Sequence, residues 1–137
     1  MIEFFVPGKP VGKKRPRFAR RGHHVQAYTP EETANYENLV AMLALEQKNQ
    51  HSPPLDSAVK VSIVINLHGP KSRPKRIIYH KTKPDADNVM KSILDGMNGI
   101  LFSDDAQAVK GEWEKRFSPG NQSEGVYVRV EYLEVAS

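Results

Sequence analysis

A chain of 137 residues with 39% hydrophobic and 26% charged residues has the size and composition of one globular domain, which excludes a disordered or fibrous protein. No run of about 18 apolar residues predicts a membrane span, and no signal peptide is visible, so we expect a cytoplasmic protein. Because cysteine is absent, disulfides and thiolate zinc sites are excluded, and an oxygen-ligated metal, Mg²⁺ with Mn²⁺ as a substitute, is the expected choice.

The net charge of +4 is unevenly distributed. Residues 1–30 carry seven basic residues and one acid, residues 68–84 carry six basic residues and no acid, and residues 85–105 carry five aspartates and one lysine. Basic segments on both sides of an acidic cluster are typical of an enzyme that attracts a polyanion, although solvated surface loops have the same composition. The basic residues that we predict to bind nucleic-acid phosphates are Lys9, Lys13, Lys14, Arg15, Arg17, Arg20, Arg21, Lys71, Arg73, Lys75, Arg76, Lys81 and Lys83.

The N-terminal third predicts a strand, a loop and a helix. Apolar residues alternate over residues 2–6, which indicates a strand that ends at Pro7-Gly8. Residues 7–24 are rich in Gly, Pro and Arg, which argues against regular structure and favours a loop that contacts substrate. Thr29 as a cap and Pro30 at the first helical position then predict a helix that runs to about Lys48. Its core-facing residues should be Tyr36, Leu39, Val40, Leu43 and Ala44.

The remainder predicts strand, helix, strand and strand. Apolar residues alternate over residues 59–67, and an apolar stripe with helical spacing follows over residues 87–98, where Gly96 and Gly99 should end the helix. Two further strands are expected over residues 109–117 and 126–132, with a turn at 119–121. The order β-α-β-α-β-β predicts an α+β fold in which two main helices pack on a small mixed sheet.

The acidic segment contains the residues with the most chemical information. Asp85 and Asp87 lie at the predicted start of the second helix, where the helix dipole favours negative charge. Lys91 is four positions after Asp87 and shares its helical face. Asp104 and Asp105 follow the helix after a short linker, and a chain that doubles back there would return a carboxylate to the first pair.

Converging carboxylates with open water positions form a site for Mg²⁺, which proteins commonly hold with few oxygens plus substrate phosphate. Such a cation can activate water and neutralise a scissile phosphate, and a neighbouring lysine can stabilise the transition state. Structural roles fit the same residues: Asp85 as a helix cap, Asp87 with Lys91 and Asp95 as a surface ion-pair ladder, and Asp104-Asp105 as a turn. Spacing alone leaves both interpretations open.

The whole pattern resembles the RusA family of Holliday-junction resolvases, small endonucleases associated with prophages. The resemblance rests on the run P-D-x-D-N-x-x-K-x-x-x-D-x-x-N-G followed by D-D and Q-x-V, and on an early P-G-K-P-V with K-x-R-P-R close behind. The basic insert over residues 20–24 departs from that pattern. The matching residues are Pro84, Asp85, Asp87, Asn88, Lys91, Asp95, Asn98, Gly99, Asp104, Asp105, Gln107 and Val109, with residues 7–10 and 15–17 at the front.

The resemblance implies a single endonuclease domain over residues 1–137. It implies a homodimer that binds four-way DNA junctions and makes paired symmetric cuts by Mg²⁺-dependent hydrolysis in DNA recombination and repair. Asp85, Asp87, Lys91 and Asp105 would be essential for cleavage, and the metal ligands would be the three aspartates, with Asp104 the alternative to Asp105. Two other functions remain open: a non-catalytic junction-binding or nucleic-acid-binding protein, and another metal-dependent nuclease that acts on flaps or RNA.

The other candidates are secondary. Asp95 should orient Lys91 rather than bind metal, and the five histidines share no ligand spacing. Phe18 and Tyr28 would either stack on unpaired bases or pack under the basic loop. A dimer surface should use apolar residues that the monomer core does not need. The residues that we predict for this surface are Trp113, Phe117, Val128 and Val130.

Overall fold

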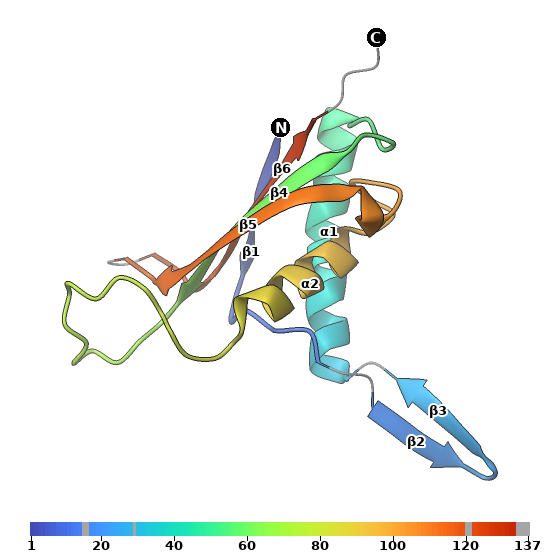
Figure 1. Ribbon diagram of the computed structural model, residues 1–137, viewed down its shortest axis with the longest axis horizontal. Coiled ribbons are helices and arrows are strands. Elements are labelled where there is room, and N and C mark those ends of the chain that lie inside the picture. The colour runs from blue at the N-terminus through green and yellow to red at the C-terminus, as the bar shows by residue number, and fades with distance from the viewer. Residues whose placement is uncertain (15–16, 29, 120–121, 134–137) are drawn as a thin grey trace.

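The computed structural model describes residues 1–14, 17–28, 30–119 and 122–133. Two main helices pack on a mixed four-stranded sheet (Figure 1), which confirms the predicted α+β fold class. The elements in chain order are β1 (Ile2–Pro7), β2 (Arg17–Arg21), β3 (His24–Tyr28), α1 (Glu31–His51), β4 (Val59–Leu67), α2 (Ala86–Met97), the 3₁₀ turn η1 (Asp105–Gln107), β5 (Ala108–Phe117) and β6 (Gly125–Tyr132).

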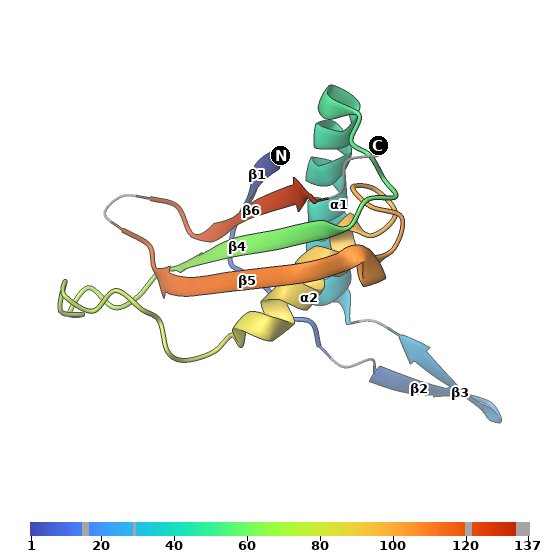
Figure 2. The same ribbon diagram turned by 45° about the horizontal axis from the view of Figure 1, so that its top comes forward.

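The sheet has the strand order β1-β6-β4-β5, so β5 is an edge strand. β6 pairs antiparallel with β1 and β4, whereas β4 and β5 are parallel. A parallel pair needs a long connection that returns the chain to the same end of the sheet, and here α2 lies within that connection. Both helices lie on one face of the sheet, and no described element covers the other face (Figures 1 and 2).

The hydrophobic core fills the space between the sheet and the two helices. Alternate residues of β4 and β6 point into it, and apolar residues at three- and four-residue spacing on the helices meet them. This arrangement confirms the two predicted helical faces. The buried residues of these faces are Tyr36, Val40 and Ala44 of α1 and Val89, Met90, Ile93 and Met97 of α2.

Residues 17–28 form a hairpin where the sequence predicted a loop. β2 and β3 pair antiparallel, with Arg20 opposite Val25, and Gly22 takes a φ of 62° in the turn. The prediction was wrong because the described side chains of this two-stranded ribbon, such as Phe18, Arg20 and Val25, are exposed, so no buried face imposes an alternation of apolar and polar residues on them. The hairpin projects from the N-terminal end of α1, away from the sheet (Figure 1).

The ends of α1 differ from the prediction. The helix continues to His51, where Ser52 takes a left-handed conformation and its N–H donates to the carbonyl of Lys48 at 2.9 Å. The predicted cap Thr29 lies outside the described residues, as do residues 120 and 121 of the predicted turn.

Gly96 does not end α2, contrary to the prediction. It lies inside the helix, and a Cβ there would come within 2.6 Å of the Val40 side chain and 3.0 Å of the Glu37 carbonyl. The glycine therefore permits the close approach of α1 and α2. The helix ends at Met97, and Gly99 follows with a φ of 78°.

Candidate functional site

The N-terminal end of α2 presents two aspartates and a lysine. Asp85 is the residue before the first helical turn, with an extended backbone, and its side chain forms no cap. Asp87 lies in the first turn, and Lys91 follows one turn later; the side chains of Asp87 and Lys91 are exposed. The carboxylates therefore lie where the unpaired N–H groups and the dipole of α2 stabilise negative charge.

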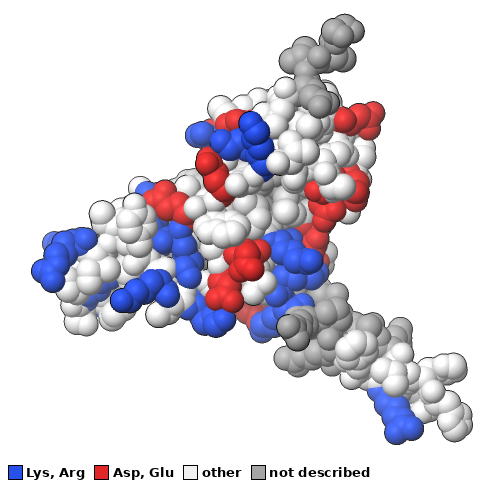
Figure 3. All heavy atoms as spheres, viewed as in Figure 1, with Lys and Arg blue, Asp and Glu red and all other residues white. Residues whose placement is uncertain are grey.

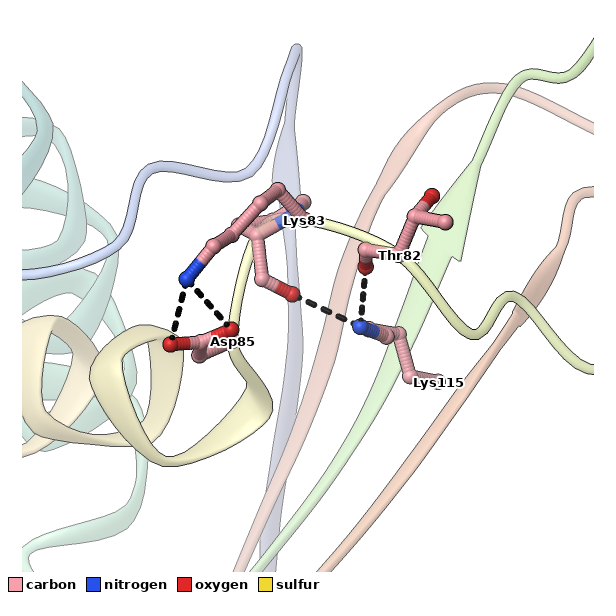
Figure 4. A network of polar contacts seen from close by, with 5 residues as sticks. Thr82, Lys83, Asp85 and Lys115 are labelled. Carbon is pink, nitrogen blue, oxygen red and sulfur yellow. Dashed lines mark hydrogen bonds and ion pairs between the residues drawn. The ribbon is translucent and has the colours of Figure 1, made fainter.

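A polar network fixes the segment that leads into α2 (Figure 4). The ammonium nitrogen of Lys83 lies 3.0 and 2.9 Å from the two carboxylate oxygens of Asp85. Lys115 of β5 donates to the carbonyls of Thr82 and Pro84, the latter at 2.8 Å. Lys115 therefore ties the C-terminal half of β5 to the residue before Asp85. The Lys83 side chain is 84% exposed, so it is free to leave Asp85 when another cation approaches.

Asp104 and Asp105 lie at the opposite end of α2. The twelve residues of this helix separate them from Asp85 by about 18 Å, at about 1.5 Å per residue. Asp104 caps η1: its carboxylate accepts from the Ala106 N–H at 3.4 Å, while its own N–H donates to the Gln107 side chain at 2.8 Å. No described residue binds the carboxylate of Asp105, which is exposed.

The expectation that the chain doubles back and brings these acids together was wrong. β5 runs back alongside α2 only after Asp105, so Asp105 stays at the far end. No group of three or more His, Asp or Glu side chains among the described residues is placed to hold a metal ion. The described residues of one chain therefore do not form a complete site for a divalent cation.

Asp95 contacts Lys13 rather than orienting Lys91. The ammonium nitrogen of Lys13 lies 2.6 Å from Glu37 and 3.2 Å from Asp95, and all three side chains are partly buried. Burial alone would lower the pKa of Lys13, but the hydrogen bonds and charges of Glu37 and Asp95 outweigh it and raise this pKa. Lys13 thus joins the N-terminal segment to both helices.

Those predicted DNA-binding residues that the structure describes fall into two groups on either side of α2. One lies around residues 9–28, including the hairpin, and the other lies in the loop of residues 68–84, which extends in the opposite direction (Figures 1 and 3). Figure 3 shows acidic side chains between them. The exposed members without an ion pair among the described residues are Lys9, Arg20, Lys71, Lys75, Arg76 and Lys81.

The other predicted members are differently placed. Lys14 pairs with Glu32 at 2.6 Å, and the hydrogen bond and charge of Lys14 lower the pKa of Glu32. Arg73 lies 4.3 Å from the centre of the Phe117 ring and donates to the Ile77 carbonyl at 2.6 Å. Arg15 and the side chains of Arg17 and Arg21 lie outside the described part, and so does the Tyr28 side chain.

The predicted dimer surface is partly wrong. Val128 and Val130 point into the core and are 2% and 0% exposed, because the alternation of β6 directs them toward the helices. Trp113 is 52% exposed at the sheet edge, which excludes a core role. Phe117 is partly covered by Arg73 and by the ring of His80 at 4.8 Å. Of the four residues predicted for this surface, Trp113 alone has a large and mostly exposed apolar side chain.

Two contacts escaped prediction from the sequence. Lys115 was assigned only to a strand, and nothing in its spacing indicates the bond to Pro84. Gln107 matched a motif, but its side chain donates to the carbonyls of Leu55 and Ser57 at 2.7 and 2.8 Å, which fixes the start of β5. Both contacts span more than 30 residues of chain.

Among the described residues, no helix has the length and apolar character needed to cross a membrane.

Comparison with known proteins agrees with the sequence pattern. The sequence model of a family described as endodeoxyribonuclease RusA matches residues 7–131. The chain is also 29% identical to the uncharacterized protein YqaN of Bacillus subtilis (strain 168), in an alignment that covers 85% of this chain and 88% of that protein. The family match includes the basic segments, α2 and both aspartate pairs. The chain belongs to the RusA family of endodeoxyribonucleases.

Proposed function

We propose that this protein is a Mg²⁺-dependent endonuclease that resolves four-way DNA junctions by paired, symmetric cuts. One observation carries the proposal: in a chain of this endodeoxyribonuclease family, the partly exposed Asp85 and the exposed Asp87 and Lys91 lie just before and within the N-terminal half of α2, between two basic segments. The basic segments would bind the phosphates of separate DNA arms and leave a phosphate at the acidic centre.

Each residue of this centre has a distinct role in the proposal. Asp85 and Asp87 would bind the divalent cation, which would neutralise charge on the scissile phosphate and assist the attack of water. Lys91 would donate to a phosphate oxygen as negative charge builds up on it. Lys115 would position Asp85 through its bond to Pro84.

Asp105 would act on the site of a second copy of the chain. Within one chain it lies at the wrong end of α2, yet the family pattern includes it and its carboxylate has no partner among the described residues. Asp104 is the weaker candidate because it caps η1. Two copies related by a two-fold axis would supply two equivalent sites, which matches the approximate symmetry of a four-way junction.

A cleavage assay tests this function. A labelled four-way junction incubated with the protein and Mg²⁺ should yield two symmetric nicks, and chelation of Mg²⁺ should stop the reaction. Binding without nicking would favour a junction-binding protein. Faster cutting of flaps or RNA than of junctions would favour a different nuclease. Either result would refute the proposal.

A further inference from the structure

The basic loop of residues 68–84 exposes three consecutive apolar side chains. Ile77 is 42% exposed, Ile78 is 55% exposed and Tyr79 is 65% exposed. Single exposed apolar residues are common on protein surfaces, but a run of three is avoided unless it serves a function. Phosphate binding by the neighbouring lysines and arginines does not account for these apolar side chains.

Backbone pairing holds Tyr79 at the edge of the sheet. The His80 N–H donates to the Lys115 carbonyl at 3.1 Å, and the Phe117 N–H donates to the Ile78 carbonyl at 2.9 Å. Tyr79 lies between these two hydrogen bonds, so its backbone has a fixed position relative to β5. Its side chain nevertheless remains mostly in solvent.

The Tyr79 side chain lies on the face of the sheet that carries no helix. Tyr79 is the antiparallel partner of Arg116, and opposite residues of such a pair share a face. Arg116 lies across from Asn66 of β4 and donates to its side-chain oxygen at 2.8 Å. The neighbours of Asn66 along β4, Ile65 and Leu67, belong to the core, so Asn66 and Tyr79 point away from the helices. No described aromatic ring stacks on Tyr79.

Contacts within the loop arrange its backbone around the Phe117 ring. Arg73 lies 4.3 Å from the centre of this ring, and the centre of the His80 ring lies 4.8 Å from it. Arg73 also donates to the Ile77 carbonyl at 2.6 Å. Tyr79 is thus presented by a loop that is already folded, and a preformed site avoids the entropic cost of ordering on binding.

Cations lie on both sides of Tyr79 in the sequence, and the loop contains no acid. Lys75, Arg76 and Lys81 are exposed, and residues 68–84 include no Asp or Glu. Such cations attract a polyanion, and an aromatic ring among them adds a surface on which a nucleobase can stack. A base inside a continuous duplex is already stacked on both faces. Only a base beside a branch or in a single strand has a face free for Tyr79.

We propose that Tyr79 stacks on an unpaired base beside the branch point of a DNA junction, while Lys75, Arg76 and Lys81 bind the neighbouring phosphates. Tyr79 would thereby favour branched DNA over a continuous duplex of the same sequence. The inference rests on the proposed function for its substrate class, a branched DNA, but it requires neither metal nor cleavage.

Lys115 connects this stacking residue with the acidic centre. Its backbone carbonyl accepts from the N–H of His80, the residue after Tyr79. Its ammonium group donates to the carbonyl of Pro84, the residue before Asp85, at 2.8 Å (Figure 4). A base held on Tyr79 would therefore place the branch point at a constant distance from the acidic centre.

Binding measured in the presence of a chelator tests the stacking contact. Tyr79→Ala should weaken junction binding about 10–100-fold, the range for loss of one base–aromatic stack, and leave binding to a duplex of the same sequence unchanged. The slope of log K against log salt should stay the same, because the variant loses no cation. An equal loss on junction and duplex, or a lower slope, would overturn the proposal.

Conservative variants and a second tyrosine provide the controls. Tyr79→Phe should retain junction affinity, whereas Tyr79→Leu, which has an apolar side chain without an aromatic ring, should bind as weakly as Tyr79→Ala. The matched control Tyr127→Ala removes a 42% exposed tyrosine on the same face, with β4 and β5 between it and residues 78–80, and should leave affinity unchanged. Full affinity of Tyr79→Leu would mean an apolar contact without stacking and would also overturn the proposal.

Photochemical cross-linking locates the base. A junction with 5-iodouracil beside the branch point should cross-link to Tyr79 under ultraviolet light, because this base couples efficiently to an aromatic ring that stacks on it. The same base in the middle of an arm should give no cross-link at Tyr79, and cross-links confined to other residues would refute the stacking site. A wild-type protein that binds and cross-links as expected but cuts no junction would refute the proposed nuclease and leave the stacking site intact. Full junction affinity of Tyr79→Ala, together with normal cleavage, would refute the stacking site alone.

Discussion

The ammonium nitrogen of Lys13 lies 3.2 Å from the carboxylate of Asp95, so a residue of the basic N-terminal segment is held against α2. Its side chain is 20% exposed and also contacts Glu37 of α1 at 2.6 Å. Lys13 therefore stabilises the packing of the two helices. The phosphate contact that we predicted for Lys13 from its charge stays a prediction, and it would have to compete with these two ion pairs.

Replacement of Lys13 by methionine should lower the free energy of unfolding by about 1–3 kcal/mol, because Glu37 and Asp95 would face each other without a cation. The control Lys14→Met removes an exposed pair with Glu32 and should cost less than about 1 kcal/mol. Urea unfolding of both variants would measure this. An equal loss of unfolding free energy in the two variants would show that Lys13 contributes no more to stability than an exposed surface charge.

The ion pairs of Lys13 with Glu37 and Asp95 also predict how stability depends on pH. The pKa of Lys13 in the folded state is raised above 10.5, its unperturbed value. A group whose pKa rises on folding stabilises the protein fully below its unfolded pKa and loses that contribution as the pH passes the folded one. The stability difference between wild type and Lys13→Met should therefore stay constant between neutral pH and pH 9 and shrink above about pH 10.5. A difference that shrinks below pH 9 would contradict the assigned ion pair.

Asp87→Asn should abolish junction cleavage while binding persists or tightens, because the change removes a proposed metal ligand and a negative charge that faces phosphate. Asp85→Asn should behave in the same way. The matched control is Asp95→Asn on the same helix, where the carboxylate contacts Lys13 and should be dispensable for cleavage. Near wild-type cutting by Asp85→Asn or Asp87→Asn would show that the metal assignment is wrong.

Lys91→Ala should reduce the cleavage rate by about 10²–10³ and change junction affinity little, because the lysine would act mainly on the transition state. Lys91 is exposed and has no ion pair among the described residues, so the variant should fold normally. Single-turnover cleavage and equilibrium binding would separate the two effects. A proportionate loss of affinity would make Lys91 an ordinary phosphate contact.

The sequence predicted well the elements that carry a strong periodic pattern. β4 matches the predicted strand, and α2 begins within one residue of its predicted start, because burial of one face forces apolar residues into a regular spacing. The hairpin escaped prediction because those of its side chains that the structure describes, such as Phe18 and Val25, are exposed and impose no such spacing. The short-range placement of Asp85, Asp87 and Lys91 also follows from helical spacing alone.

The long-range geometry of the site could not be predicted in this way. Whether Asp105 returns to Asp85 depends on the direction of β5 relative to α2, which the local sequence does not encode. The contacts of Lys13 and Lys115 join residues that lie far apart in the chain. A basic composition predicts attraction for DNA, but it does not distinguish a cation that stabilises the fold from one that faces solvent.

The exposed loop of residues 68–84 should contribute to the salt dependence of binding. Replacing Lys71, Lys75 and Arg76 with glutamine should lower the slope of log K against log salt by about one unit for each lost phosphate contact. The control Lys48→Gln changes a charge near the other end of α1, far from the hairpin, and should leave the slope unchanged. An unchanged slope in the triple variant would place this loop away from DNA.

Complementation between two inactive variants would test whether each site combines acids from two chains. Asp85→Asn and Asp105→Asn homodimers should both be inactive, because each lacks one proposed ligand in both sites. In a mixed dimer, one site would lose both residues, whereas the other would combine Asp85 of one copy with Asp105 of the other and remain intact.

The mixture should therefore regain cleavage and nick one strand of each junction, with about half of the dimers being mixed if the subunits exchange freely. The measurement is single-turnover nicking of a junction labelled on opposing strands, before and after the two proteins are mixed. The control mixes Asp85→Asn with Asp87→Asn, whose changes lie at the same end of α2, so every site in the mixed dimer loses a ligand and no activity should return. If each site were built from one chain, every subunit would keep its own defect. Mixing Asp85→Asn with Asp105→Asn would then restore no cleavage, which would contradict the prediction.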